Sequence, residues 1–272
     1  MFTKLPAKQL PQVATAINTL TAFLAMRDVP TLTPAEIHTQ LGQPLDTLIL
    51  FGGSPIAGLE HFVKAMRAGV AQHYLIVGGH GHTTPKLRAQ LSQFSGLDLS
   101  QVPSEAEMFQ RVAQVSYGQE IPLLETQSTN SGNNVTNSLA VLRRHDIVPA
   151  NIGLIQDGSL QRRLAAGFSK EVPTVPLVNF AAYQISVVVR DGQLAFAHDE
   201  VGMWSLSDYV NLVMGEIPRL HDTSAGYGPA GAGYIAHVAV PADVLAAHRL
   251  LQEQLGVTTR VANAEFKTIS ED

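Results

Sequence analysis

The chain has 272 residues, 45% of them apolar, with 22 glycines and 15 prolines spread along its length. This composition predicts an ordinary globular protein that forms one large domain, or one large domain with a small appendage. Its 18 Lys and Arg residues against 23 Asp and Glu residues give a net charge of −5 without a basic run, which disfavours nucleic acid or an anionic membrane as partner. The absence of cysteine excludes disulfides, thiolate catalysis and cysteine-bound metal centres.

The first apolar segment, residues 13–26, is expected to form an amphipathic helix packed on the domain. Ile17, Leu20 and Leu24 recur on one helical face, whereas threonines and an asparagine interrupt the segment, as they do not in a signal sequence. No other segment approaches the roughly 20 apolar residues that a membrane-spanning helix needs. We therefore expect no membrane insertion and a cytoplasmic location.

From residue 46 the sequence alternates between short apolar strands and amphipathic helices. Strands over residues 47–51 and 73–77 each end in a glycine pair, and helices over 56–66 and 104–118 follow them. A polar loop separates the second strand from its helix, which begins with a Ser-x-x-Glu capping box.

Three further strands continue the same alternation of strands and helices. They are expected over residues 121–124, 151–156 and 175–180, with helices from Asn133 to Arg144 and over 160–168 between them. Repeated strand–helix alternation with short connections is typical of parallel sheets with right-handed crossovers. The sequence therefore predicts an α/β fold, a Rossmann-like doubly wound parallel sheet, in a domain over residues 1–184 that includes the N-terminal helices.

Beyond residue 184 the alternation of strands and helices ends, and a smaller C-terminal α+β region is predicted over residues 185–272. Its expected elements are a hairpin over 185–197, a helix over 205–214, a strand over 234–240 and a last helix that stops at Gly256. Between helix and strand lies the glycine-rich loop 223–233, which is either a flap over a ligand or a simple connector.

Polar residues collect at the predicted carboxyl ends of the first four strands. In an open parallel sheet this edge binds ligands, because strand ends and helix N-termini converge there. The glycine pairs could form anion-binding nests of backbone N–H groups, and Arg162 or Arg163 could clamp a phosphate or carboxylate. The candidate ligand-binding residues are Gly52, Gly53, Ser54, Gly78, Gly79, His80, Gly81, His82, Thr83, Gln127, Ser128, Thr129, Asn130, Asn134, Gln156, Asp157, Arg162, Arg163 and, from the glycine-rich loop, Tyr227.

The turn from Glu125 to Asn134 carries a carboxylate, hydroxyls and amides between a strand and a helix. Helix capping explains one or two of these residues but leaves the others as candidates for a binding site. Glu125, Glu105 and His82 are the candidate catalytic residues, as general base, acid or metal ligand. Glu105 also lies in the first turn of its helix, where the dipole favours a negative charge regardless of function.

Several cofactor motifs are absent. The turn after the first strand is neither a G-x-G-x-x-G motif nor a P-loop, and the second strand ends in Gly-Gly-His instead of an acidic residue, which disfavours a dinucleotide pocket. No G-x-S-x-G elbow surrounds Ser54. The pair His80 and His82 is too unspecific a pattern for a zinc site, so no metal is predicted.

These strand ends resemble the bacterial family that includes YdcF, SanA and ElyC, and they are most similar to the YdcF branch. The matching motifs are Gly-Gly-x-Gly-His at 78–82, Glu105, Glu-x-Gln-Ser-Thr-Asn-x-Gly-x-Asn at 125–134, Gln-Asp-x-x-x-Gln-Arg-Arg at 156–163, Gly-Glu-x-Pro-Arg-Leu at 215–220 and Gly-Tyr-Gly-Pro-x-Gly at 226–231. The resemblance implies a Rossmann-like fold with an added C-terminal region and a nucleoside-type ligand such as S-adenosylmethionine. It implies no known reaction.

The sequence thus predicts a protein that binds an anionic or nucleoside-type small molecule at the carboxyl edge of a parallel sheet. Two alternatives remain open. One is a hydrolase or transferase acting on phosphate-linked substrates, and the other is a regulatory binding module without catalysis.

Overall fold

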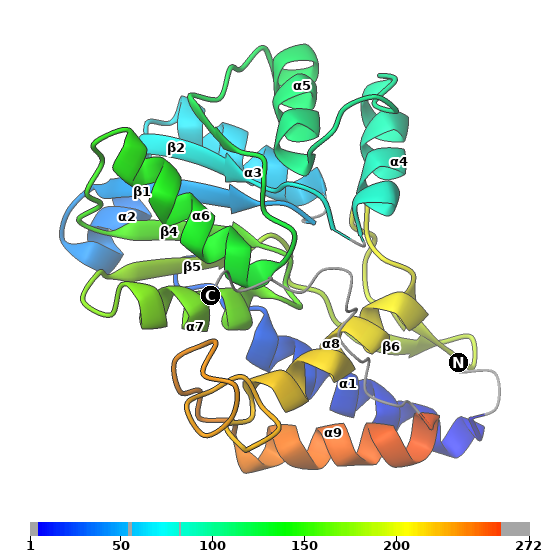
Figure 1. Ribbon diagram of the computed structural model, residues 1–272. Helices are drawn as coiled ribbons and strands as arrows, with labels where there is room; N and C mark the ends of the chain where they lie inside the picture. Colours follow the sequence, from blue (N-terminus) through cyan, green and yellow to red (C-terminus); the bar gives the residue numbers. More distant parts are fainter. Residues whose placement is uncertain (1–4, 54–55, 82, 257–272) are drawn as a thin grey trace.

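The computed structural model describes residues 5–53, 56–81 and 83–256. Within these residues five strands form one parallel sheet in the order β3-β2-β1-β4-β5 (Figure 1). The strands are β1 (Leu45–Phe51), β2 (Ala71–Val77), β3 (Leu123–Glu125), β4 (Ile152–Gln156) and β5 (Leu177–Ala181). This arrangement confirms the predicted Rossmann-like α/β fold, in which the strand order reverses between β1 and β4, beside the position where such sheets bind ligands.

The sheet is buried on both faces, which explains the uninterrupted apolar sequence of its central strand. In β1, Leu48 and Leu50 belong to one apolar cluster, while Ile49 and Phe51 belong to a second cluster on the opposite face. Leu50 pairs in register with Ile76 of β2 and Ile155 of β4. Successive side chains of a strand point to opposite faces, so a continuous apolar run supplies both cores.

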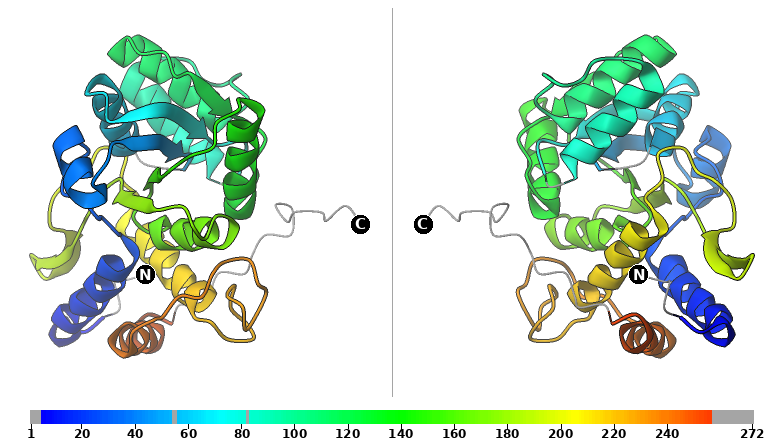
Figure 2. Two further views of the ribbon diagram at one scale, coloured as in Figure 1. Left: turned by 90° about the vertical axis from the view of Figure 1, so that its left-hand side faces the viewer. Right: turned by 90° about the vertical axis from the view of Figure 1, so that its right-hand side faces the viewer.

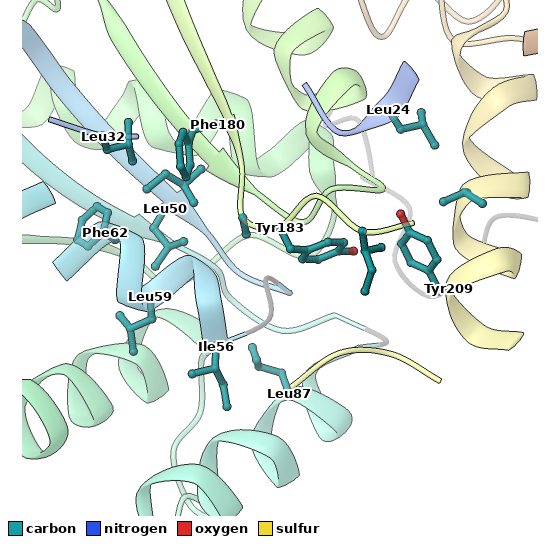
Figure 3. Close-up of a cluster of buried hydrophobic side chains, with 14 of the residues drawn as sticks. Leu24, Leu32, Leu50, Ile56, Leu59, Phe62, Leu87, Phe180, Tyr183 and Tyr209 are labelled. Carbon is teal, nitrogen blue, oxygen red and sulfur yellow. The ribbon is translucent and has the colours of Figure 1, made fainter. Parts of the chain in front are cut away.

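Helices cover both faces of the sheet (Figures 1 and 2). On one face lie α3 (Ile56–Arg67) and α5 (Glu105–Tyr117), and on the other lie α6 (Ser131–Arg144) and α7 (Gln161–Glu171). Figure 3 shows part of the larger core, where Phe62 of α3 lies near Leu50 and Phe180 of the sheet.

A helix replaces part of the polar loop predicted between residues 80 and 103. α4 (Thr84–Ser95) begins at a Thr-Pro pair and ends at Gly96, whose φ of 72° allows a left-handed helix cap. Leu87 and Leu91 are one helical turn apart and buried, and α4 packs against α5. The prediction of a loop was wrong because the buried Leu87 and Leu91 anchor a helix whose sequence is otherwise mainly polar.

The C-terminal region forms a hairpin and two helices. The hairpin strands β6 (Val187–Arg190) and β7 (Gln193–Phe196) pair antiparallel, and α8 (Leu206–Leu220) and α9 (Ala242–Leu255) follow. The N-terminal helix α1 (Leu10–Leu24) packs against α8, α9 and β6, and it lies beside these elements in Figures 1 and 2. The remaining elements are η1 (Ala7–Gln9) and α2 (Pro34–Leu41), which contacts β1.

Two C-terminal expectations were wrong. α8 does not stop before Gly215 but continues to Leu220 through Pro218. Residues 234–240 form no strand in the described part of the chain. The N–H groups of Tyr234 and Ile235 both donate to the Tyr227 carbonyl, and that of Ala236 donates to the Ala166 carbonyl of α7, so no ladder with a neighbouring strand forms.

In the described ranges, no helix combines the length and apolar character that crossing a membrane requires.

Candidate functional site

The turns after β1, β2, β3 and β4 open onto one cleft of about 210 Å³. α8 and the chain on either side of it form the opposite wall, below the sheet in Figure 1. The predicted residues that line this cleft are Gly52, Gly53, Gly78, Gly79, His80, Gly81, Thr83, Glu105, Ser128, Thr129, Asn130, Asn134, Gln156, Asp157, Arg163 and Tyr227. The structure therefore brings the four strand-end groups together, while their contact with a ligand stays a prediction.

Other predicted residues do not line the cleft. Glu125 is buried behind the turn that forms part of the cleft wall, and Gln127 is exposed outside the cleft. Arg162 points away, because its Nε donates to the carbonyl of Phe23 and its guanidinium stacks over the Phe23 ring at 4.1 Å. Ser54 and His82 lie outside the described residues.

The glycine turns do not form the predicted anion-binding nests. The N–H groups of Gly52 and Gly78 bond to the carbonyls of Val77 and Glu125 at 2.6 and 2.9 Å. The N–H of Gly79 donates to Ser128 Oγ at 3.1 Å. These three donors are used inside the protein and the Gly53 backbone bonds to the Glu105 carboxyl, so the glycine pairs contact the protein's own groups.

Glu105 occupies the space that Gly52 and Gly78 leave open. A Cβ atom at position 52 would overlap Glu105 Oε2, and one at position 78 would lie 3.0 Å from Glu105 Cβ. The side chain is only 6% exposed yet reaches the cleft. Burial raises the pKa of the Glu105 carboxyl to about 7, although hydrogen bonds from Thr84 and the Gly53 backbone lower it.

Thr84 orients this carboxyl. Its hydroxyl oxygen accepts from the Gly81 N–H at 2.7 Å and donates to Glu105 Oε1 at 2.6 Å. Arg88 also favours the ionised carboxyl at longer range, but its guanidinium bonds to the carbonyls of Leu99 and Val102.

Glu125 holds the turn that leads into α6. Its Oε1 accepts from the N–H groups of Gln127 and Ser128 at 2.7 and 3.0 Å and from Asn137 Nδ2 at 3.2 Å. In the described part of the chain its buried Oε2 has no hydrogen-bond partner. Because the carboxyl does not line the cleft, the geometry supports a positioning role for Glu125, and its catalytic role stays a prediction.

The polar turn ends in the cap of α6. The Asn130 side chain accepts from the Asn133 N–H at 3.0 Å, which accounts for one polar residue of the cluster. Thr129, Asn130, Ser131 and Asn134 all line the cleft. The positive end of the α6 dipole, with polar side chains around it, therefore faces the cleft.

Asp157 is a fully buried carboxylate on the cleft wall. Oδ1 accepts from the N–H and hydroxyl of Ser159 at 2.8 and 2.7 Å and from the hydroxyl of Tyr183, and Oδ2 accepts from the indole N–H of Trp204 at 2.7 Å. Burial raises the pKa of Asp157, whereas these donors oppose that rise. Four donors aimed at one carboxyl satisfy its ionised form.

The basic side of the cleft is an Arg–Glu–Arg cluster. Arg163 Nε and Nη2 donate to both oxygens of Glu216, which is 3% exposed, and Arg219 Nη1 lies 3.4 Å from Glu216 Oε1. Burial by itself lowers the pKa of Arg163, but Glu216 more than offsets this and raises it. Two guanidiniums against one carboxylate leave a net positive charge.

The glycine-rich loop carries Tyr227 to this cluster. Arg219 lies 5.9 Å from the Tyr227 ring centroid, and Tyr227 packs edge-on against Tyr234 at 5.3 Å. A Cβ at Gly226 or Gly228 would overlap His221 or Asp222 just before the loop, and one at Gly231 would overlap the Gly226 carbonyl oxygen. The glycines thus serve tight internal folding, and movement of the loop as a flap stays a prediction.

Sequence reasoning missed several residues of the cleft. They are Leu160, Trp204, Asn211, Leu212 and Glu216. Glu216 and Arg219 belong to a motif of the family resemblance, which was a usable signal, and Trp204 is the single tryptophan of the chain. Asn211 and Leu212 carry no signal, because only tertiary packing brings α8 to the sheet edge.

Comparison with models of known protein families gives no match to this chain. Among the described residues, no group of three or more His, Asp or Glu side chains is placed to hold a metal ion.

Proposed function

We propose that this is a cytoplasmic protein of the YdcF type that binds an anionic or nucleoside-type small molecule, such as S-adenosylmethionine, in the cleft at the carboxyl edge of the sheet. The observation that carries the proposal is the composition of the cleft wall. Amide and hydroxyl groups at the start of α6 face the net positive cluster of Arg163, Glu216 and Arg219. Helix N-termini and guanidiniums are typical partners of phosphate and carboxylate groups.

The aromatic side chains support a ligand with a planar part. Trp204 and Tyr227 line the cleft, and aromatic walls of this kind favour a nucleobase or another flat ring. A volume of about 210 Å³ suits a small molecule or one part of a larger one. The family resemblance makes S-adenosylmethionine the first compound to test.

Catalysis on phosphate-linked substrates is the second candidate, and Glu105 is the observation that favours it. A carboxyl in the cleft with a pKa of about 7 exchanges its proton near neutral pH, as a general acid or base does. Arg163 and Arg219 would stabilise charge that develops on a phosphate.

Native mass spectrometry of protein purified from cells tests binding directly, because it reveals a retained ligand by its mass. Calorimetry with that compound then locates the site. We expect Asn134→Leu, in the cleft, to weaken binding about tenfold by removing hydrogen bonds. Thr136→Leu, on the same helix but exposed and outside the cleft, should bind like the wild type. Equal losses in both variants, or none in either, would place the ligand elsewhere.

A further inference from the structure

Glu105 and Asp157 place two carboxyl groups on the wall of a cleft whose opposite side is net positive. Four donors bond to the Asp157 carboxyl and oppose the rise that burial gives its pKa. A negative charge on Glu105 would repel an anionic ligand from this part of the cleft. The protonation state of Glu105 therefore decides what the cleft accepts.

The hydrogen bonds of Glu105 determine which oxygen carries its proton. The Thr84 hydroxyl accepts from the Gly81 N–H and donates to Glu105 Oε1. While Thr84 keeps donating to it, Oε1 is the acceptor, and the proton of a neutral carboxyl is carried by the other oxygen. When Glu105 is neutral, its proton resides on Oε2, the oxygen beside the Gly52 turn of the cleft wall.

We propose that Glu105 binds the ligand as a neutral acid, donating a hydrogen bond from Oε2 to an anionic oxygen, so that ligand binding takes up one proton when Glu105 is ionised. This inference rests on the proposed function, because it requires an anionic ligand in the cleft. Thr84 is a positioning residue, since it acts through Glu105. If the site is catalytic, Glu105 enters the reaction in the protonated state of a general acid.

The cleft and its surroundings carry other charged or ionisable groups besides Glu105. His80 lies on the turn after β2, Asp157 on the turn after β4, and Arg163, Glu216 and Arg219 on the opposite side. Arg88 acts on Glu105 from α4. Burial raises the pKa of Glu105 to about 7, so its titration falls near neutral pH. His80 is ionisable and also lines the cleft, which makes it the group to control for.

Sulfate is a suitable probe, because it is an anion whose charge stays constant over this pH range. Trp204, the single tryptophan of the chain, lines the cleft, so its fluorescence reports binding. Between about pH 7 and pH 9 we expect the sulfate affinity of the wild type to fall about tenfold per pH unit. Glu105→Gln, which keeps a donor beside Gly52, should bind sulfate with a pH-independent affinity.

Three further variants separate Glu105 from its surroundings. Glu120→Gln, an exposed carboxyl outside the cleft, should behave like the wild type. Thr84→Val removes a hydrogen bond that favours the ionised carboxyl, so the loss of affinity should begin at higher pH, whereas Thr84→Ser should restore the wild-type profile. His80→Asn should keep the wild-type dependence. The two Thr84 variants keep the test valid if Glu105→Gln does not fold.

The outcomes distinguish this inference from the proposed function. If sulfate binds the wild type and Glu105→Gln with the same pH dependence, or if His80→Asn alone abolishes it, Glu105 is not the proton carrier, although the anion site stands. If sulfate binds none of the proteins at any pH, the anion site itself is wrong and this inference falls with it.

Discussion

At the residue scale, the burial of Glu105 couples the stability of the fold to pH. Its pKa of about 7 lies above the 4.5 of an exposed carboxyl, so the folded protein binds this proton more tightly than the unfolded chain. The resulting stabilisation is present in full below about pH 4.5 and is lost as the pH rises to about 7. A shift of this size corresponds to about 3 kcal/mol.

We predict that Glu105→Gln removes this part of the pH dependence. The free energy of unfolding, measured by urea denaturation, should fall by about 3 kcal/mol more in the wild type than in the variant between about pH 4.5 and pH 8. Taking the difference between the proteins cancels the titration of other groups. Parallel pH profiles would mean that the carboxyl keeps its ordinary pKa in the folded protein.

At the element scale, Gly79 joins the end of β2 to the turn before α6. A Cβ at this position would overlap the carbonyl oxygen of Ser128 and lie 2.7 Å from its nitrogen. We predict that Gly79→Ala lowers the free energy of unfolding by about 1–3 kcal/mol, because two backbones must separate. Gly81→Ala is the matched control in the same turn, since its Cβ would lie 3.7 Å from the nearest described neighbour, the Thr129 carbonyl oxygen. A similar loss in both variants would mean that the close approach of the two backbones at Gly79 is not the cause.

The glycine-rich loop 223–233 allows a test of flap movement. Tyr227 lines the cleft from this loop, so a bound ligand would contact it directly. We predict slower amide hydrogen exchange over residues 223–233 when the cleft is occupied. The hairpin of β6 and β7, which does not line the cleft, serves as an internal reference whose exchange should not change. Unchanged exchange in the loop would make it a connector.

At the scale of the whole molecule, ion pairs join the C-terminal region to the sheet. Arg163 of α7 and Glu216 of α8 form a bidentate pair with side-chain exposures of 16% and 4%, whereas Lys86 of α4 and Asp208 of α8 pair at exposures of 37% and 54%. Because the Arg163–Glu216 pair is buried and the Lys86–Asp208 pair is exposed, we expect loss of the first pair to lower the free energy of unfolding more. A buried charge that loses its partner stays desolvated, while an exposed charge is solvated by water.

We predict that Glu216→Gln destabilises the protein by about 3–5 kcal/mol, because it leaves the Arg163 guanidinium without its carboxylate. Lys86→Ala should cost roughly 1 kcal/mol, including its contact with the Trp204 ring. Urea denaturation measures both. Equal effects would show that Glu216 remains solvated when the protein is folded.

The strands and most helices of the sheet domain follow from local sequence patterns. The apolar run of β1 and the Ser104–Glu107 capping box of α5 act over a few residues, so they can be recognised without tertiary information. The convergence of the strand-end turns follows as well, because parallel strands all end at one edge.

Tertiary structure decided the remaining features through contacts that are distant in sequence. Pro218 has no N–H to donate to the Met214 carbonyl inside the helix. His248 Nε2 of α9 lies 3.0 Å from that carbonyl oxygen and replaces the missing partner, so α8 continues past Gly215. Arg162 and Arg163 are neighbours in sequence, yet one stacks on Phe23 and the other pairs with Glu216 in the cleft. A sequence pattern specifies the face on which a side chain lies, but the partner on that face is determined only when the elements pack.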